Sequence, residues 1–182
     1  KRNFLVAING NFKSSNTLPD WITNIQQKAL EQLEATKLPN QKHPNWKHTS
    51  LSFLKDEQFL LSNTQPTLTE DKISSLKKQG HINLVIMDGE FIKTYSDSLP
   101  QEVSIYPIAE TPTDYIKEIE KTKDNRASNP DYTDHLNNLF FKKGFFFKLT
   151  KQSIVQKTIH LIHISTLQTK KKSLSFVKNS FY

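Results

Sequence analysis

Apolar residues recur at three- and four-residue steps between positions 22 and 33, which is the period of a helix with one buried stripe. The stripe consists of Ile22, Ile25, Ala29, Leu30 and Leu33. The opposite positions are polar or charged: Asn24, Gln27, Lys28, Glu31 and Glu34. Thr17 or Asp20 is expected to cap the first backbone N–H groups. The pattern predicts a docked amphipathic helix that begins at Leu18-Pro19-Asp20-Trp21 and ends near Lys37.

The stretch after this helix, residues 38–54 (LPNQKHPNWKHTSLSFL), contains two prolines and a tryptophan. Pro39 and Pro44 favour extended backbone, because proline disfavours helix in the residue before it. Trp46 is flanked by basic residues, namely Lys42, His43, Lys47 and His48. A loop tryptophan usually fills a gap in the core and donates its ring N–H to a carbonyl. The alternative is a basic-aromatic surface that stacks on nucleic-acid bases, but such surfaces use several aromatic rings and this cluster has one.

A second helix is expected from Thr69 to Gly80, because acidic residues follow its start and glycine commonly follows a helix end. After Gly80 the spacing of the apolar residues no longer has the period of a helix. An apolar run over 82–87, the dipeptide Asp88-Gly89 and a further apolar pair predict a β-hairpin over residues 82–93. Residues 103–108 alternate as another strand, and Pro107 favours an edge position because it lacks an N–H for the ladder.

The last third of the chain begins with helices and continues with short strands. A helix is expected over 111–123, a mobile polar loop over 121–130, and a short helix from Asp131 that Gly144 stops. The apolar stripe of that short helix is Leu136, Leu139 and Phe140. Strands are expected at 145–149, 158–164 and 174–177, a series found in sandwiches and parallel β-helices. The third strand would leave an open edge, which native folds avoid, so we interpret the chain as the front part of a longer protein.

The amino-acid composition limits the chemical groups that the chain can supply. The chain has 182 residues and no cysteine, so it supplies no disulfide, no thiolate nucleophile and no thiolate ligand for a cluster. No stretch has the length of a membrane span, and a soluble, cytoplasmic protein is the default expectation. The net charge is +7, and after Asp134 the chain carries nine lysines and no acidic residue. This asymmetry supports one alternative function, a basic nucleic-acid-binding module that uses the lysine-rich strands after residue 135.

Three segments together resemble the SufB/SufD family of iron–sulfur cluster assembly scaffolds, and the SufD branch most closely. In the first segment Trp46, Lys47, Thr49 and Leu51 match, whereas Pro44 stands where the family usually has Glu and His48 where it usually has Tyr. The second segment is the strand and Asp-Gly turn of residues 84–91, followed by Ser96-Asp97. The third comprises residues 136–140, 144–146 and 158–165. The three segments occur in the family's order and spacing.

The resemblance implies an α+β chain in which a helical N-terminal region with a β-hairpin leads into the first coils of a right-handed parallel β-helix. The corresponding segments are a helical region at 1–78, a small α/β segment at 79–130 and the start of the β-helix at 131–182. It also implies a non-catalytic scaffold subunit of the SUF complex, with a SufB-like paralogue and a SufC-like ATPase as partners. An iron–sulfur cluster is expected only in the full complex, and no cofactor is expected on this chain.

No catalytic, cofactor-binding or metal-binding residue is predicted. His160 and His163 are three positions apart on a strand and therefore point to opposite faces, so they do not share a metal ion. His43 and His48 are expected at the surface, while His81 and His135 have no visible partner. Asp131 and Asp134 are interpreted as helix-capping residues. Lys170, Lys171 and Lys172 are interpreted as a solvated turn, and a β-helical carbohydrate-active enzyme is disfavoured because residues 135–182 contain no carboxylate pair.

Overall fold

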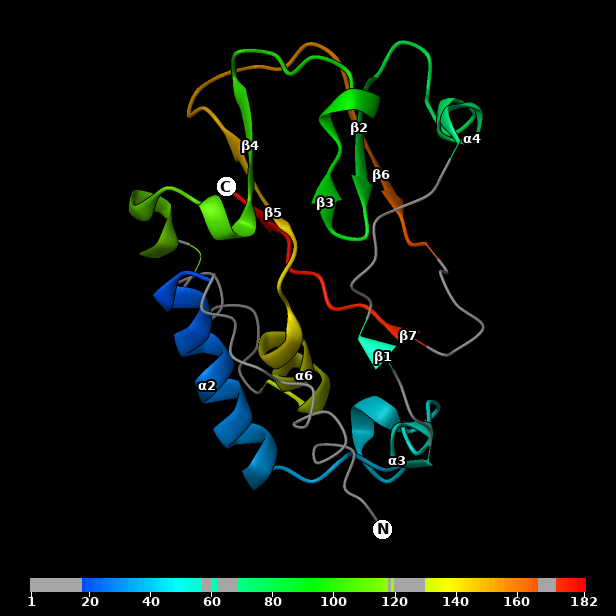
Figure 1. Ribbon diagram of the computed structural model, residues 1–182, viewed down its shortest axis with the longest axis vertical. Coiled ribbons are helices and arrows are strands. Elements are labelled where there is room, and N and C mark those ends of the chain that lie inside the picture. The colour runs from blue at the N-terminus through cyan, green and yellow to red at the C-terminus, as the bar shows by residue number, and fades with distance from the viewer. Residues whose placement is uncertain (1–17, 57–59, 62–68, 118, 120–129, 167–172) are drawn as a thin grey trace. The chain divides into compact units, whose positions relative to one another are not determined.

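The computed structural model describes residues 18–56, 60–61, 69–117, 119, 130–166 and 173–182, and it is a mixed α+β structure (Figure 1). These residues belong to two compact units whose segments alternate along the chain. The helical unit comprises Lys1–Leu61, Ala127–Phe140 and Thr169–Leu174; the sheet unit comprises Ser62–Arg126, Phe141–Gln168 and Ser175–Tyr182. The division at residues 78 and 130 stays a prediction.

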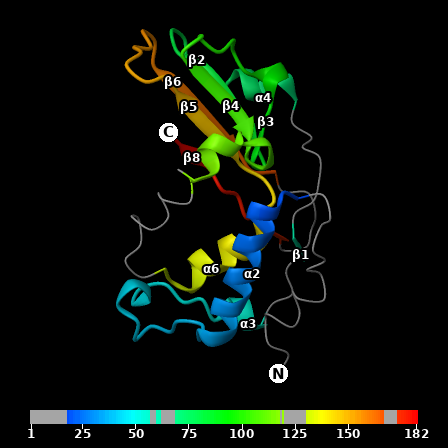
Figure 2. The ribbon, with the colours of Figure 1, turned by 90° about the vertical axis from the view of Figure 1, so that its left-hand side faces the viewer.

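The helical unit is built on two helices that pack side by side, α2 (Asp20–Ala35) and α6 (Tyr132–Phe140) (Figure 2). The predicted stripe on α2 is confirmed at Ile22, Ala29 and Leu33, which are buried. Ile25 and Leu30 are half-buried, and the polar Gln26 is buried with the stripe. On α6 the predicted stripe is fully confirmed: Leu136, Leu139 and Phe140 are buried.

The predicted side-chain cap of α2 is wrong for Asp20. Pro19 occupies the N-cap position, no side chain caps the helix there, and Asp20 is already the first helical residue. Its carboxylate still lies in the first turn, where it suits the positive end of the helix dipole. Thr17, the other candidate cap, lies outside the described residues. The helical unit also contains the short helix α3 (Phe53–Asp56) and the parallel pair of β1 (Leu60–Leu61) and β7 (Ser173–Leu174).

The first sheet of the sheet unit has the strand order β3-β2-β6. The predicted hairpin is confirmed: β2 (Ile82–Met87) and β3 (Glu90–Phe91) pair antiparallel. Asp88 and Gly89 at the turn both have positive φ, 47° and 86°, as a two-residue type I′ turn requires. Strand β6 (Ile159–Ile164) runs parallel to β2 on the other side. One face of this sheet packs Val85, Met87 and Ile162 against Ile73 of α4 (Glu70–Ser74).

The second sheet has the order β4-β5-β8. Strand β4 (Val103–Pro107) lies at its edge, as Pro107 predicted, and pairs antiparallel with β5 (Phe145–Leu149). Strand β8 (Ser180–Phe181) pairs parallel with β5. Phe145 and Phe146 of the central strand are buried, and Tyr106 and Tyr115 lie over the Phe146 ring at centroid distances of 6.4 and 5.4 Å. Phe146 and the two tyrosines thus pack together on one face of the second sheet.

Several predicted boundaries differ from the structure. Helix α4 ends at Ser74, well before Gly80, which lies in the following turn with φ of 78°. The strand expected at 174–177 is divided: β7 ends at Leu174, and Val177 makes only an isolated parallel bridge to Lys143. Helical residues at 113–117 and 119 agree with the helix expected after Thr111, and the loop expected at 121–130 lies almost entirely outside the described residues. The sheet unit also contains two short 3₁₀ helices, η2 (Lys93–Tyr95) and η3 (Ile108–Glu110).

In the described part of the chain the strands form no coil of a β-helix. Consecutive strands of a β-helix stack in parallel on one another, whereas β5 and β6 join different sheets and β5 pairs antiparallel with β4. The reason is that β6 finds its partner in β2, an earlier strand of the hairpin, across a parallel register of six residues. None of the described helices is long and apolar enough to span a membrane.

Candidate interaction surface around Trp46

The Trp46 loop, residues 38–52, connects α2 to α3 and is mostly exposed. At its centre is the 3₁₀ helix η1 (Pro44–Trp46), which begins at a proline because the first helical residue needs no N–H partner. The backbone N–H of Trp46 donates to the carbonyl of His43 at 2.9 Å, and that of Thr49 donates to the carbonyl of Trp46 at 3.2 Å. These two hydrogen bonds hold the loop in a defined turn.

Trp46 connects this loop to the start of α6. Its ring N–H donates a hydrogen bond of 3.0 Å to Oδ2 of Asp131, 85 residues further along the chain. The side chain is half-buried. The predicted carbonyl acceptor is therefore wrong, because the acceptor is a carboxylate. The half-buried ring is only partly removed from solvent, and its hydrogen bond positions the loop.

Asp131 has a second role as the N-cap of α6, as predicted. Its Oδ1 accepts hydrogen bonds from the backbone N–H groups of Thr133 at 2.8 Å and Asp134 at 3.2 Å, and from the Thr133 hydroxyl at 2.6 Å. Asp134 reciprocates, since its Oδ2 accepts from the backbone N–H of Asp131 at 2.9 Å. This reciprocal arrangement is a capping box with an aspartate at N3. One carboxylate thus joins the helix start to the Trp46 loop.

The hydrogen bonds to Asp131 also determine its ionisation. Burial, the largest single influence, raises the pKa of its carboxyl group. The hydrogen bonds from Thr133, Asp134 and Trp46 all favour the charged form, and together they lower the pKa below its ordinary value of 3.8. The carboxylate is therefore charged at neutral pH, which also suits the helix dipole.

Replacing Trp46 with phenylalanine keeps an aromatic ring but removes the N–H donor. We expect a loss of about 1 kcal/mol in the free energy of unfolding, the usual net value of a hydrogen bond that is not fully desolvated. A double-mutant cycle with Asp131→Asn, followed by urea unfolding, measures the coupling. Asparagine still caps the helix, so the cycle isolates the Trp46 contact. Additive effects of the two substitutions would contradict this contact.

The lowered pKa of Asp131 predicts a pH dependence of its contribution. The unfolded carboxyl binds a proton more readily than the folded one, so this contribution is fully present above the unfolded pKa and is lost as the pH falls through the folded pKa. We expect Asp131→Asn to destabilise the chain at pH 7 and to have progressively less effect below about pH 4. Urea unfolding of both proteins from pH 7 to pH 3 measures the difference. A difference that grows as the pH falls would show that the sign is wrong.

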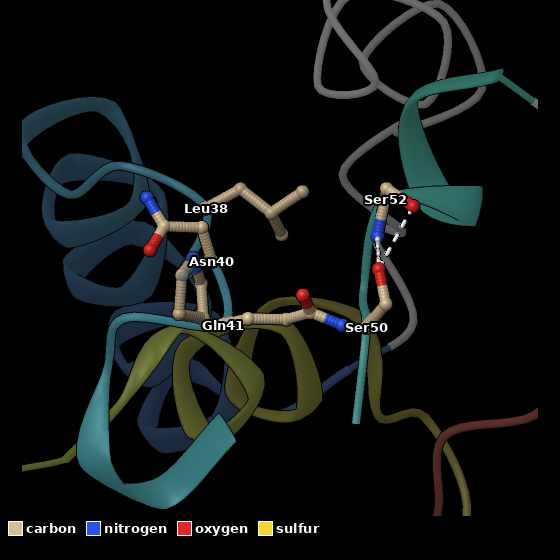
Figure 3. A pocket seen from close by; sticks show the side chains of 6 residues that line it. Leu38, Asn40, Gln41, Ser50 and Ser52 are labelled. Atoms are coloured by element: carbon tan, nitrogen blue, oxygen red, sulfur yellow. Dashed lines mark hydrogen bonds between the residues drawn. The ribbon is translucent and has the colours of Figure 1, made fainter. Parts of the chain in front are cut away.

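A shallow pocket of about 240 Å³ lies between the two arms of the Trp46 loop (Figure 3). Its lining consists of Leu38, Pro39, Asn40, Gln41, Ser50 and Ser52. The Ser50 and Ser52 hydroxyls are 2.9 Å apart, and the Ser52 N–H donates to the Ser50 hydroxyl at 3.2 Å. The lining contains no ionisable side chain, so it does not provide a general acid or base.

The sequence comparison bears directly on this loop. A family model described as the SufBD protein N-terminal region matches residues 13–161. The chain belongs to the SufB/SufD family. The match covers the Trp46 loop, the hairpin and the first half of β6, which lie in the segments that carried the resemblance. No curated protein matches the chain.

Membership in the SufB/SufD family implies a role in iron–sulfur cluster assembly by the SUF system. The family consists of non-catalytic scaffold subunits. The Trp46 loop, which the hydrogen bond to Asp131 holds in place, lies within the matched residues. Lys42, His43, Lys47 and His48 are all exposed on it, as expected for the two histidines.

Three of the lysines that follow residue 135 in this SufB/SufD-family chain contact side chains in the described part of the fold. Lys143 makes an ion pair with Glu90 at 2.7 Å. Lys148 donates to the Tyr115 hydroxyl, and its ammonium lies 4.6 Å from the centre of the Tyr115 ring. The Lys178 ammonium lies 5.1 Å from the centre of the Phe141 ring. Lys170, Lys171 and Lys172 lie outside the described residues. Three of the nine lysines thus have partners within the fold.

The remaining histidines are placed partly as predicted. The prediction that His160 and His163 lie on opposite faces of β6 is confirmed, with His160 half-buried and His163 exposed. His135 is buried on α6. His81, for which the sequence showed no partner, lies beside the ring of His160. Sequence reasoning missed this pair because the parallel alignment of β2 with β6 brings the two rings together.

Proposed function

We propose that the chain is the N-terminal portion of a SufD-like, non-catalytic scaffold subunit of a SUF complex. Its partners are a SufB-like paralogue and a SufC-like ATPase, and the complex works in the cytoplasm. The family match over residues 13–161 carries this proposal. The cluster is the cargo that the complex assembles. Because this chain has no cysteine, the thiolates that hold the cluster come from the partner or from a later part of the natural protein.

The sheet unit gives a structural basis for the remainder of the proposal, which is that a right-handed parallel β-helix follows. Two of its strand pairs, β2–β6 and β5–β8, are already parallel. Within the described residues β8 is an edge strand, so its outer side can template a further parallel strand. A structure of the longer natural protein tests this. A strand paired to the outer side of β8 supports the β-helix, and a helix covering that edge would contradict it.

Affinity purification of the longer natural reading frame from its own cell lysate, followed by mass spectrometry, tests the function. We expect a SufC-like ATPase and a cysteine-bearing SufB-like paralogue in stoichiometric amounts. Recovery of nucleic acid or ribosomal proteins without the ATPase would contradict the scaffold and support the nucleic-acid alternative. That alternative also predicts oligonucleotide binding at about 50 mM salt, where phosphate contacts are strongest.

A charge reversal in the Trp46 loop tests whether this surface contacts a partner. Lys47 is exposed and directly follows Trp46. We expect Lys47→Glu to reduce the recovery of a partner severalfold and to leave the melting temperature unchanged. Lys28→Glu on the exposed face of α2 is the matched control, because it makes the same change in charge on the same unit. Equal recovery with both variants would place the contact surface elsewhere.

A further inference from the structure

His81 and His160 lie side by side in the sheet unit although they are far apart in the sequence. The parallel register of β2 and β6 places Ile82 opposite Ile159 and Asn83 opposite His160. His81 directly precedes β2, so its ring reaches the neighbourhood of His160. The two ring centroids are 6.2 Å apart and the ring planes are inclined by 70°. Both side chains are half-buried, which leaves one part of each ring accessible.

The hydrogen bonds of the two rings determine which nitrogen carries the proton. Nδ1 of His81 lies 3.0 Å from the carbonyl oxygen of Gln79, which only accepts, so Nδ1 is the donor. Nδ1 of His160 lies 3.1 Å from Oδ1 of Asn83. In a neutral imidazole with a protonated Nδ1, the lone pair is on Nε2. Both histidines therefore present Nε2 as an electron-pair donor.

The orientation of the Asn83 amide, on which this assignment depends, follows from its other partners. Oδ1 of Asn83 accepts from the backbone N–H of Lys78 at 2.8 Å, so this atom is the oxygen. Nδ2 donates to the Lys78 carbonyl at 3.0 Å, to the His81 carbonyl at 3.3 Å and to Oδ2 of Asp97 at 3.0 Å. Asn83 itself is 4% exposed, so this network holds it in one orientation. His160 is consequently fixed by a buried amide that a carboxylate supports.

A carboxylate, Asp97, supports the asparagine that holds His160. Asp97 accepts the backbone N–H of Asn83 at 2.7 Å and lies one hydrogen-bonded residue away from His160. The nearby ammonium of Lys77 makes an ion pair with Asp97 at 3.4 Å. Histidine metal ligands usually donate their other ring N–H to an oxygen acceptor, as Nδ1 of His81 and Nδ1 of His160 do here.

From these contacts we propose that His81 and His160 bind one divalent transition-metal ion through their Nε2 atoms. Imidazole nitrogen suits zinc, copper, nickel and ferrous ions. With metal–nitrogen bonds of about 2 Å, two rings on a tetrahedral ion have centroids roughly 5 Å apart, so these rings need to approach by about 1 Å. Among the described residues no group of three or more His, Asp or Glu side chains is placed to hold a metal ion. Water completes the coordination, and the affinity is lower than that of a three-ligand site.

Zinc titration of the 182-residue chain, followed by calorimetry, tests the proposal with the metal alone. We expect one zinc ion per chain, and at least a tenfold loss of affinity in both His81→Gln and His160→Gln. His163→Gln is the matched control, because His163 is an exposed residue on the opposite face of the same strand. Binding that survives in the double variant His81→Gln/His160→Gln would overturn the proposal. Equal loss in the His163 control would do the same.

A second measurement requires no variant and therefore does not depend on how the substitutions fold. Diethyl pyrocarbonate modifies accessible imidazole nitrogens, and mass spectrometry locates the modified residues. Zinc is expected to protect His81 and His160 together and to leave His163 reactive. Reactivity of His81 and His160 that zinc does not change would overturn the proposal. The scaffold function is unaffected by either result, because it rests on the family match and is tested by the recovery of protein partners.

Discussion

Replacing Gly144 with alanine should remove roughly 4 kcal/mol of folding free energy, through positive-φ strain combined with a steric clash. Gly144 precedes β5 with φ of 147°, a conformation that residues with a Cβ rarely adopt. A Cβ at this position would be 1.8 Å from the backbone oxygen of Lys178 and 2.6 Å from its carbonyl carbon. Backbone atoms do not rotate away as a flexible side chain does.

The close approach at Gly144 is part of the pairing on both sides of this segment. The backbone N–H of Lys178 donates to the Lys143 carbonyl at 3.1 Å, and that of Ile108 donates to the Gly144 carbonyl at 2.9 Å. An alanine must therefore separate Lys178 from the start of β5. We expect the loss to include the parallel pairing of β8, which begins two residues after Lys178.

Gly80→Ala is the matched control for this prediction. Gly80 also has positive φ, 78°, but a Cβ there would have no atom within 4 Å. The Gly80→Ala substitution should lower the free energy of unfolding by only about 1–2 kcal/mol, which is the strain of a left-handed backbone conformation. Urea unfolding of the two variants measures both losses, and equal losses would mean that the contact with Lys178 contributes nothing.

The second large effect is expected at Asn83, where alanine should cost roughly 3 kcal/mol because buried polar groups lose their partners. The amide of Asn83 accepts from Lys78 N–H and donates to the carbonyls of Lys78 and His81 and to Asp97. Alanine supplies none of these hydrogen bonds. Because position 83 is only 4% exposed, water does not readily replace the amide as a partner of these backbone and carboxylate groups.

Asn179→Ala is the control for the Asn83 prediction, because it makes the same substitution at a half-buried asparagine of the same unit. Oδ1 of Asn179 accepts one hydrogen bond, of 3.3 Å, from the backbone N–H of Phe145. Its loss should cost about 1 kcal/mol or less. Thermal unfolding compares the two, and a smaller loss at Asn83 than at Asn179 would contradict the proposed network.

The Asn83 network also explains the ionisation of Asp97. The hydrogen bond from the Asn83 backbone N–H is the largest influence on this carboxyl group, and it lowers the pKa. Burial raises the pKa, but the Asn83 amide and Lys77 lower it further, so the net direction is downward. The charged form of Asp97 is therefore maintained beside the histidine pair at neutral pH.

The local pattern of the sequence determined much of the secondary structure correctly. The stripes of α2 and α6, the Asp88-Gly89 hairpin, the edge position of Pro107 and the cap at Asp131 were all predicted, because each depends on residues within a few positions of one another. The separation of His160 from His163 followed from the two-residue period of a strand. Gln26 was missed because it is polar, although it is four residues after Ile22 and three before Ala29 and so lies on the buried stripe.

Only the tertiary structure decided which distant segments meet. Trp46 finds Asp131, His160 finds Asn83 and His81, and the backbone of Lys178 approaches Gly144. The expected series of strands after residue 144 also separates into two sheets, because β6 pairs with the earlier β2. The physical reason is that a short strand has backbone donors and acceptors that any other strand can satisfy. Its partner and register are chosen by the burial of whole faces, which the order of residues along one strand does not specify.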